Sequence, residues 1–191
     1  MVTAKGERLD CDLAVVGLGV EPVVELAAEA GLAVSNGVDV DERCRTSAPG
    51  VYAAGDVANH WHPVFGRSVR VEHWQHAIRH GRAAALNLMG RDAPYTEVHW
   101  FWSEQYDQRI EYAGFHTDWD DLVVRGSLEG RDFTAFYRKD DRLLAVVAMN
   151  RRQDIRRAIP LIAAGGMVDR AALGDEAIDL AELAPKAAAP S

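Results

Sequence analysis

Short apolar runs separated by glycine-containing turns make up most of the first sixty residues. The run at residues 12–17 does not alternate with polar positions, which is typical of a strand buried on both faces of a parallel sheet. Residues 23–30 predict a short helix that ends at Gly31, and residues 38–41 predict an alternating strand. A second buried strand is predicted over residues 51–55. This part of the chain is therefore expected to form pieces of an α/β sheet.

A longer helix and a set of strands follow. Apolar residues recur at helical spacing over residues 73–89, before Gly90 and Pro94, so we predict one helix there. From about residue 97, apolar runs with short polar turns predict an antiparallel sheet with a hairpin tip at Asp140-Asp141. The predicted strands span residues 110–114, 122–128, 133–138 and 143–149. A helix over residues 153–164, kinked at Pro160, is expected to close this part.

The pattern predicts an α/β fragment followed by an α+β C-terminal domain with an antiparallel sheet. Buried parallel strands need neighbours and covering helices, and residues 1–96 contain few of either. Unpaired apolar strands also promote association. We therefore expect the first part of the chain to be mobile, oligomeric, or completed by another chain.

Charge and composition exclude several classes of function. The 191 residues carry a net charge of −8, which argues against nucleic acid as a main partner, because phosphate binding needs a basic face. No apolar run of about 18 residues predicts a membrane span, and no signal peptide is apparent, so a cytoplasmic protein is expected. Cys11 and Cys44 lie outside any Cys-x-x-Cys, which excludes a dithiol redox motif.

The segment Thr-Ser-Ala-Pro-Gly-Val-Tyr-Ala-Ala-Gly-Asp-Val-Ala at residues 46–58 carries the clearest chemistry. Ala53, Ala54 and Gly55 are small enough to let a strand end approach a cofactor closely. The carboxylate of Asp56 can accept a hydrogen bond from a ribityl or ribose hydroxyl. This segment resembles the second flavin-binding signature of two-dinucleotide-domain flavoprotein reductases.

Three further segments agree in order and spacing. They are Leu-Ala-Val-Val-Gly-Leu-Gly-Val-Glu-Pro at residues 13–22, Arg-Val-Glu-His-Trp-Gln-His-Ala at residues 70–77, and Trp-Phe-Trp-Ser-Glu-Gln at residues 100–105. Together they resemble the C-terminal part of the FAD-dependent NAD(P)H:ferredoxin reductases of bacterial oxygenase systems, in the glutathione-reductase-like superfamily. Apoptosis-inducing factor has similar segments. The resemblance covers about residues 9–183.

The resemblance implies a domain division and a cofactor site. Residues 1–45 would end the NAD(P)H-binding domain, residues 46–96 would be the returning segment of the FAD-binding domain, residues 97–183 the reductase C-terminal domain, and residues 184–191 a disordered tail. FAD would be the cofactor and NAD(P)H the substrate, with no side-chain acid or base required. The implied cofactor-binding residues are Gly55, Asp56, Val57, Glu72, His73, Trp74, Ala77 and Trp102.

An iron–sulfur ferredoxin would be the electron acceptor by the same resemblance. The one candidate basic patch consists of Arg151, Arg152, Arg156 and Arg157. Such a patch could steer an acidic ferredoxin, and it could equally be a solvated helix start. A flavoprotein reductase with another acceptor is a further interpretation.

The sequence also departs from the family. Val23 stands where the family usually has Asn, and Glu104 where it usually has Asp. Neither of the family's two Gly-x-Gly-x-x-Gly phosphate loops occurs in the sequence, so we predict that this chain alone binds FAD weakly or not at all. A non-catalytic interaction module that keeps the fold without flavin is therefore an alternative function.

Five histidines lie close together in the sequence, which raises the question of a metal site. His60 and His62 are followed by His73, His76 and His80, the last two at i, i+4. Zinc sites need three or four convergent ligands, and no acidic or cysteine partner stands at matching spacing. His76 and His80 could simply face solvent, so no metal site is predicted.

Overall fold

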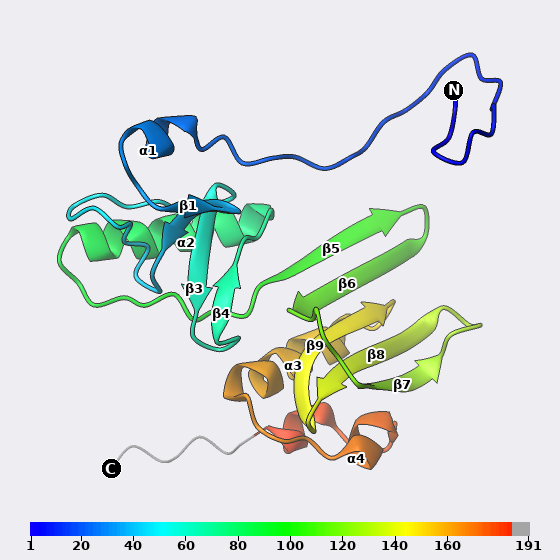
Figure 1. Cartoon of the computed structure of the whole chain (residues 1–191). Helices are drawn as coiled ribbons and strands as arrows, with labels where there is room; N and C mark the ends of the chain where they lie inside the picture. The colour runs from blue at the N-terminus through cyan, green and yellow to red at the C-terminus, as the bar shows by residue number, and fades with distance from the viewer. Residues whose placement is uncertain (185–191) are drawn as a thin grey trace, which may run out of the picture.

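The computed structural model describes residues 1–184, which form two sheets that are joined through a long helix (Figure 1). The first sheet has the order β1-β2-β3-β4, and β2 and β3 are its parallel pair. Its strands are β1 (Val34–Ser35), β2 (Gly37–Val40), β3 (Ala58–His62) and β4 (Arg67–Val69). The helices α1 (Glu25–Glu29) and α2 (Trp74–Leu88) belong to this part of the chain.

The second sheet has five strands in the order β5-β6-β9-β8-β7, all antiparallel. Its strands are β5 (Trp100–Gln105), β6 (Gln108–Gly114), β7 (Asp121–Ser127), β8 (Asp132–Lys139) and β9 (Arg142–Met149). The helices α3 (Arg152–Ala164) and α4 (Arg170–Gly174) and the 3₁₀ helix η1 (Leu180–Leu183) follow. The predicted α+β region with an antiparallel sheet is confirmed.

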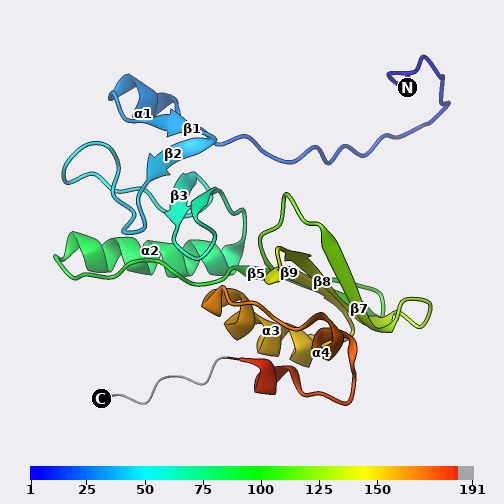
Figure 2. The ribbon, with the colours of Figure 1, turned by 60° about the horizontal axis from the view of Figure 1, so that its bottom comes forward.

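The main core lies between this sheet and α3, which packs on β9 and β6 (Figure 2). The helix buries Ile155, Leu161 and Ile162 at helical spacing, facing the fully buried Phe136 of β8. Helix α3 continues through Pro160 as one helix. At the predicted hairpin tip, Asp140 and Asp141 both have positive φ, a backbone conformation that suits the tight connection from β8 to β9.

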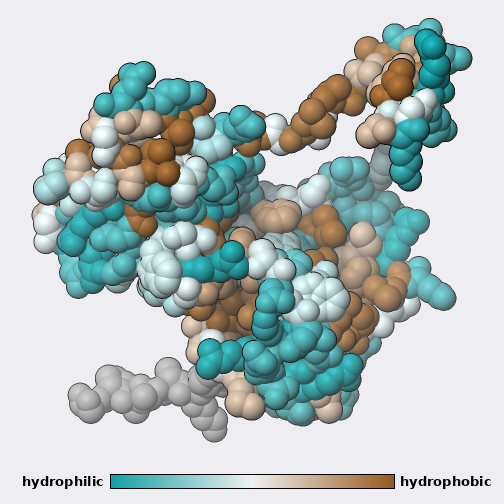
Figure 3. Space-filling view, in the orientation of Figure 1, coloured by the Kyte–Doolittle hydropathy of each residue, from teal (hydrophilic) through white to brown (hydrophobic). Residues whose placement is uncertain are grey.

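The predicted strand at residues 12–17 is wrong. The structure has no strand there, and Leu13 and Val15 are 81% and 91% exposed. Figure 3 shows the apolar side chains of this extended segment standing away from the rest of the molecule. No strand among residues 1–184 lies beside the segment, and an isolated strand cannot satisfy its backbone hydrogen bonds.

The predicted strand at residues 51–55 is also wrong. Tyr52 makes one isolated bridge to Arg45, and the strand that pairs with β2 is β3, a few residues later. The predictions for residues 23–30, 38–41, 73–89 and 153–164 correspond to α1, β2, α2 and α3, with small shifts at the ends. The predicted tail lies outside the described residues, except for Ala184. Within residues 1–184, no helix is long and apolar enough to cross a membrane.

Candidate cofactor site

The turn at Gly55-Asp56 is held on both sides. Gly55 has φ +80, and its backbone N–H donates to Nδ1 of His80 at 3.2 Å. On the other side, the Arg70 guanidinium donates to the backbone carbonyl of Asp56 at 3.2 Å and forms an ion pair with Glu72 at 2.6 Å. Since the backbone is fixed at both residues, the Asp56 side chain projects from a preorganised turn.

Helix α2 packs closely against this turn. A Cβ placed on Gly55 would stand 3.6 Å from Cβ of Ala77, which is an ordinary contact distance. The structure thus brings together Gly55 and Ala77, two of the residues assigned to the cofactor by resemblance. Small side chains at both positions allow the first turns of α2 to lie directly beside the Gly55-Asp56 turn.

Asp56 is exposed and lines an open pocket of about 340 Å³. Val57, Arg70 and residues 20–23 also line it. The carboxylate can therefore accept hydrogen bonds from a hydroxylated ligand lying in this pocket. The segment at residues 20–23 is the one that resembles the pyridine-nucleotide half of the reductases.

Aromatic rings gather where α2 begins. His73 precedes the helix, and its ring centroid lies 5.7 Å from that of Trp102 and 6.0 Å from that of Phe101. The Arg109 guanidinium lies 5.5 Å from the centre of the Trp102 ring. Burial lowers the pKa of His73, and the nearby Asp56 carboxylate opposes that shift. His73 and Trp102 are therefore neighbours, although they come from separate segments, and His73 lies close enough to Asp56 for that carboxylate to act on its pKa.

Trp74 does not join this group. It is 70% exposed and makes no ring contact within residues 1–184. Glu72 is exposed too, and its role in the structure is the ion pair with Arg70. Among the predicted residues, the cluster near the turn consists of Gly55, Asp56, Val57, His73, Ala77 and Trp102.

These residues fit one end of a flavin. An exposed carboxylate, a close backbone approach and a helix N-terminus suit the hydroxylated chain and the polar edge of such a cofactor. The phosphate end has no counterpart in the sequence, because the Gly-x-Gly-x-x-Gly loops are absent.

Five histidines lie buried behind the turn, and we refer to them as the histidine cluster. They are His60, His62, His76, His80 and His99. The possibility that His76 and His80 face solvent is wrong, because both are buried on the face of α2 that packs inward. Both histidine spacings, i, i+2 in β3 and i, i+4 in α2, are visible in the sequence, but the packing of β3 against α2 that brings the two pairs together is not.

Burial and mutual repulsion lower the pKa values of the clustered histidines, so the rings are neutral. Burial, followed by the neighbouring His80 and His76, lowers the pKa of His60 to about 2. Burial and other histidines lower the pKa of His76 to about 3 and that of His80 to about 4. The rings therefore present neutral nitrogens to one another at ordinary pH.

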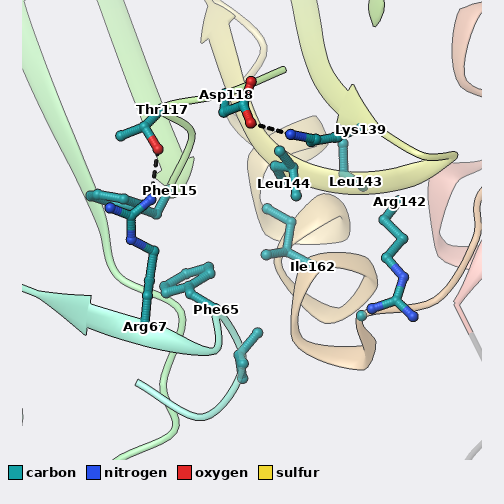
Figure 4. A pocket seen from close by; sticks show the side chains of 12 residues that line it. Phe65, Arg67, Phe115, Thr117, Asp118, Lys139, Arg142, Leu143, Leu144 and Ile162 are labelled. Atoms are coloured by element: carbon teal, nitrogen blue, oxygen red, sulfur yellow. Dashed lines mark hydrogen bonds and ion pairs between the residues drawn. The ribbon is translucent and has the colours of Figure 1, made fainter. Parts of the chain in front are cut away.

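Another pocket lies away from the predicted site (Figure 4). It measures about 280 Å³ and lies between the β3–β4 turn and the start of β9. Arg67 donates to the Thr117 hydroxyl at 2.7 Å and stacks over Phe115, and Lys139 pairs with Asp118. None of the predicted cofactor residues lines this pocket. The Arg67 guanidinium already donates to Thr117, and the Lys139 ammonium is already paired with Asp118.

The four arginines at the start of α3 are not equivalent. Arg151 forms ion pairs with Asp132 and Glu176, and Arg157 lies 3.3 Å from Asp179. Arg152 and Arg156 are exposed and form no ion pair within residues 1–184. Two of the four charges are therefore free to meet a partner.

Comparisons with known proteins agree with this layout. Residues 1–81 match the model of the pyridine nucleotide-disulphide oxidoreductase family, and residues 100–184 match the reductase C-terminal family. The ferredoxin–NAD(+) reductase component of the anthranilate 1,2-dioxygenase system of Burkholderia cepacia is 44% identical over 93% of this chain. Human apoptosis-inducing factor 3 is 33% identical over 86% of the chain.

A solved structure gives the same result. The structure of a covalent putidaredoxin reductase–putidaredoxin complex matches 94% of this chain with a TM-score of 0.87 and 37% identity. The chain spans 44% of the length of the Burkholderia relative and 43% of that solved chain. Residues 1–81 thus match the pyridine nucleotide-disulphide oxidoreductase family and residues 100–184 match the reductase C-terminal family, in the same order as in the ferredoxin reductases to which the chain is similar.

Proposed function

We propose that this chain is the part of a flavoprotein that binds the ribityl side of FAD, in a reductase that passes electrons from NAD(P)H to a ferredoxin. The preorganised Gly55-Asp56 turn carries the proposal, because it aims an exposed carboxylate into an open pocket beside the N-terminus of α2. The chemistry that FAD supplies when bound is hydride acceptance and release of single electrons.

The residues of this chain bind and position. Asp56 accepts a hydrogen bond from a ribityl hydroxyl, and Gly55 and Val57 give the cofactor close access to the backbone. Ala77 keeps α2 against the turn, so that the positive end of the helix lies near the site. His73 and Trp102 form an aromatic wall beside Asp56. Trp74 and Glu72 take no part in the cofactor contact of this proposal.

A chimera tests the assignment directly. The C-terminal part of the Burkholderia cepacia reductase is replaced by this chain, and the flavin content and NADH-dependent ferredoxin reduction of the purified chimera are measured. We expect a yellow protein with activity. Asp56→Ala in the chimera should weaken flavin retention by about 1.5–3 kcal/mol, because a charge-assisted hydrogen bond is lost.

Glu129→Ala serves as the matched control. Glu129 is exposed in the turn between β7 and β8, and its carboxylate makes no hydrogen bond or ion pair in the described part of the chain. Unchanged flavin affinity in Asp56→Ala, with the same result in Glu129→Ala, would remove Asp56 from the site. A chimera that folds but lacks flavin would count against the cofactor assignment as a whole.

The absence of a phosphate-binding loop from this sequence favours the alternative function, a non-catalytic interaction module without flavin. Without a glycine-rich phosphate loop in the sequence, the FAD pyrophosphate would lose its backbone donors. We expect the isolated chain to bind FAD weakly or not at all when FAD fluorescence is titrated. A non-catalytic interaction module predicts the same result, and the chimera separates the two functions.

The acceptor is proposed to dock on the free arginines of α3. In the chimera, reversing Arg152 and Arg156 to Glu should slow ferredoxin reduction and flatten its salt dependence, and reduction of a small neutral dye should be spared. Reversing Arg91 and Arg142, two exposed arginines elsewhere, makes the same change in net charge. Equal losses with both acceptors would point to a folding defect or another docking face.

A further inference from the structure

Three imidazoles of the histidine cluster converge behind the Gly55-Asp56 turn, and we refer to them as the histidine triad. His60 comes from β3, and His76 and His80 come from successive turns of α2. Each offers one ring nitrogen, and the three atoms lie within 4.8 Å of one another. The arrangement joins a strand and a helix, because residues i and i+4 of a helix project from the same face.

The nitrogens that meet there have no hydrogen-bond partner within residues 1–184. Both ring nitrogens of His60 are in this state, as are Nε2 of His76 and Nε2 of His80. All three residues are buried, and His60 and His80 have no exposed surface. Buried polar atoms in proteins are nearly always paired, so three histidines that converge with unpaired ring nitrogens indicate a partner that binds imidazole nitrogen.

The outer nitrogens are held in place. The Tyr95 hydroxyl lies 3.1 Å from Nδ1 of His76, so Nδ1–H can donate to it and leave the Nε2 lone pair facing the other two rings. An oriented imidazole of this kind is typical of a metal ligand with a supporting hydrogen bond.

His80 has a different outer partner. Its Nδ1 accepts the hydrogen bond from the Gly55 N–H, so in this state the ring carries its hydrogen on Nε2. A cation bound at Nε2 requires the other neutral tautomer, in which the hydrogen has moved through solvent from Nε2 to Nδ1. The hydrogen bond from the Gly55 N–H to Nδ1 is given up in that tautomer, so metal binding should change the Gly55-Asp56 turn.

We propose that the histidine triad binds one transition-metal ion of the class that prefers imidazole nitrogen, such as Zn²⁺. The ion would link β3 to α2 directly behind the cofactor turn. A tetrahedral site with Zn–N bonds of about 2.0–2.1 Å puts its nitrogens about 3.4 Å apart, so the rings close inward by small rotations. A fourth coordination position remains for water.

The test uses the purified chain without flavin or ferredoxin, so its outcome is independent of the proposed function. After chelator treatment, the chain is titrated with Zn²⁺ and, as a spectroscopic probe, with Co²⁺. We expect one bound ion per chain by mass spectrometry of the gel-filtered protein, visible Co²⁺ bands, and an increase in Tm with Zn²⁺. His60→Gln, His76→Gln and His80→Gln should each abolish the bands and the increase in Tm.

Two further variants separate the site from loss of fold and from surface binding. Tyr95→Phe leaves the triad in place but removes the support of His76, so Zn²⁺ affinity should fall about 10- to 100-fold. His116→Gln changes a half-buried histidine that bonds Tyr112, outside the cluster, and should keep full affinity. Absence of stoichiometric binding in the wild-type chain, or wild-type affinity in every triad variant, would overturn the proposal.

Discussion

Gly55 has a backbone conformation that would be strained for any other residue. Its φ of +80 lies in the left-handed region, and a Cβ there would touch Ala77 only at ordinary contact distance. The constraint is therefore conformational and not one of space. Gly81 differs, because it lies within α2 with helical backbone and has open space where a side chain would stand.

These two glycines should respond to the same substitution in opposite directions. Gly55→Ala should lower the free energy of unfolding by about 1–2 kcal/mol, because an L-residue is strained at this φ. Gly81→Ala should raise it by about 0.5–1 kcal/mol, because alanine favours the helix. Urea denaturation followed by circular dichroism measures both. Destabilisation of similar size at both positions would show that packing decides the outcome at Gly55.

The two cysteines differ in accessibility. Cys44 is fully buried beside α2, and burial, with the nearby Asp41 charge, raises the pKa of its thiol to about 12. Cys11 is exposed. Because the thiolate is the reactive form, we expect iodoacetamide to label Cys11 and leave Cys44 unmodified in the native protein.

Mass spectrometry of digested protein measures this difference. Denaturant should make Cys44 react as well, and Cys11→Ser should leave no labelling under native conditions. Rapid native labelling of Cys44 would mean that the packing around α2 opens readily.

For single residues, the sequence predicted which side chains could bind a cofactor more successfully than it predicted which side chains are buried. The small residues and the carboxylate of residues 46–58 were visible in the sequence because the motif is contiguous. The histidine cluster was not, because it depends on how β3 lies against α2, and histidine is compatible with both solvent and core. Its members come into contact only in the folded chain.

Among the elements, β7 is tied to the end of the chain by one buried side chain. Arg125 donates to the backbone carbonyls of Asp175 and Ile178 at 3.0 and 2.8 Å and lies 3.8 Å from the Asp154 carboxylate. Both charged groups are buried. This arginine thus joins β7, α3 and the segment between α4 and η1.

Replacing Arg125 should loosen all three elements together. We expect Arg125→Met to lower the free energy of unfolding by about 3 kcal/mol, because it leaves the buried carbonyls of Asp175 and Ile178 without a donor and removes one of the cations beside the buried Asp154 carboxylate. Arg142→Met, at an exposed arginine of β9, should change it by less than about 0.5 kcal/mol. Chemical denaturation compares the two, and a small effect of Arg125→Met would mean that water replaces the guanidinium.

The elements also explain where prediction from sequence succeeded. Strands β7, β8 and β9 have apolar runs bounded by polar turns, so local pattern sufficed. Strand β3 reads Ala-Asn-His-Trp-His, and this polar composition concealed a buried strand. The position of β9 between β6 and β8 depends on pairing between distant residues, which no local pattern encodes.

At the scale of the whole molecule, the two parts differ in how well their apolar residues are covered. The five-stranded sheet and its helices enclose the largest core. The segment at residues 12–20 instead runs extended, and no strand of the described residues 1–184 lies beside it (Figure 1). We propose that a neighbouring chain or a self-associated copy covers this segment, as the expected need for sheet neighbours suggests.

Hydrogen exchange should reveal this difference. Amides of β9, at the centre of its sheet, should exchange slowly, and those of Leu13–Val16 should exchange quickly. Native-state exchange read by mass spectrometry, together with the molar mass in solution, makes the comparison. Equal protection in a monomeric chain would mean that residues 1–96 form a self-sufficient core.

The central position of β9 has a consequence for the folding rate. The hairpins β5–β6 and β8–β9 join residues close in sequence, but β6 and β9 pair Gly114 with Ala145 across all of β7 and β8. Closing that loop costs chain entropy before the new contacts compensate for it. We therefore expect the hairpins to form first and the pairing of β6 with β9 to be the slow step in folding. Helix α3 packs on β6 and β9, so it can dock only after these two strands have paired.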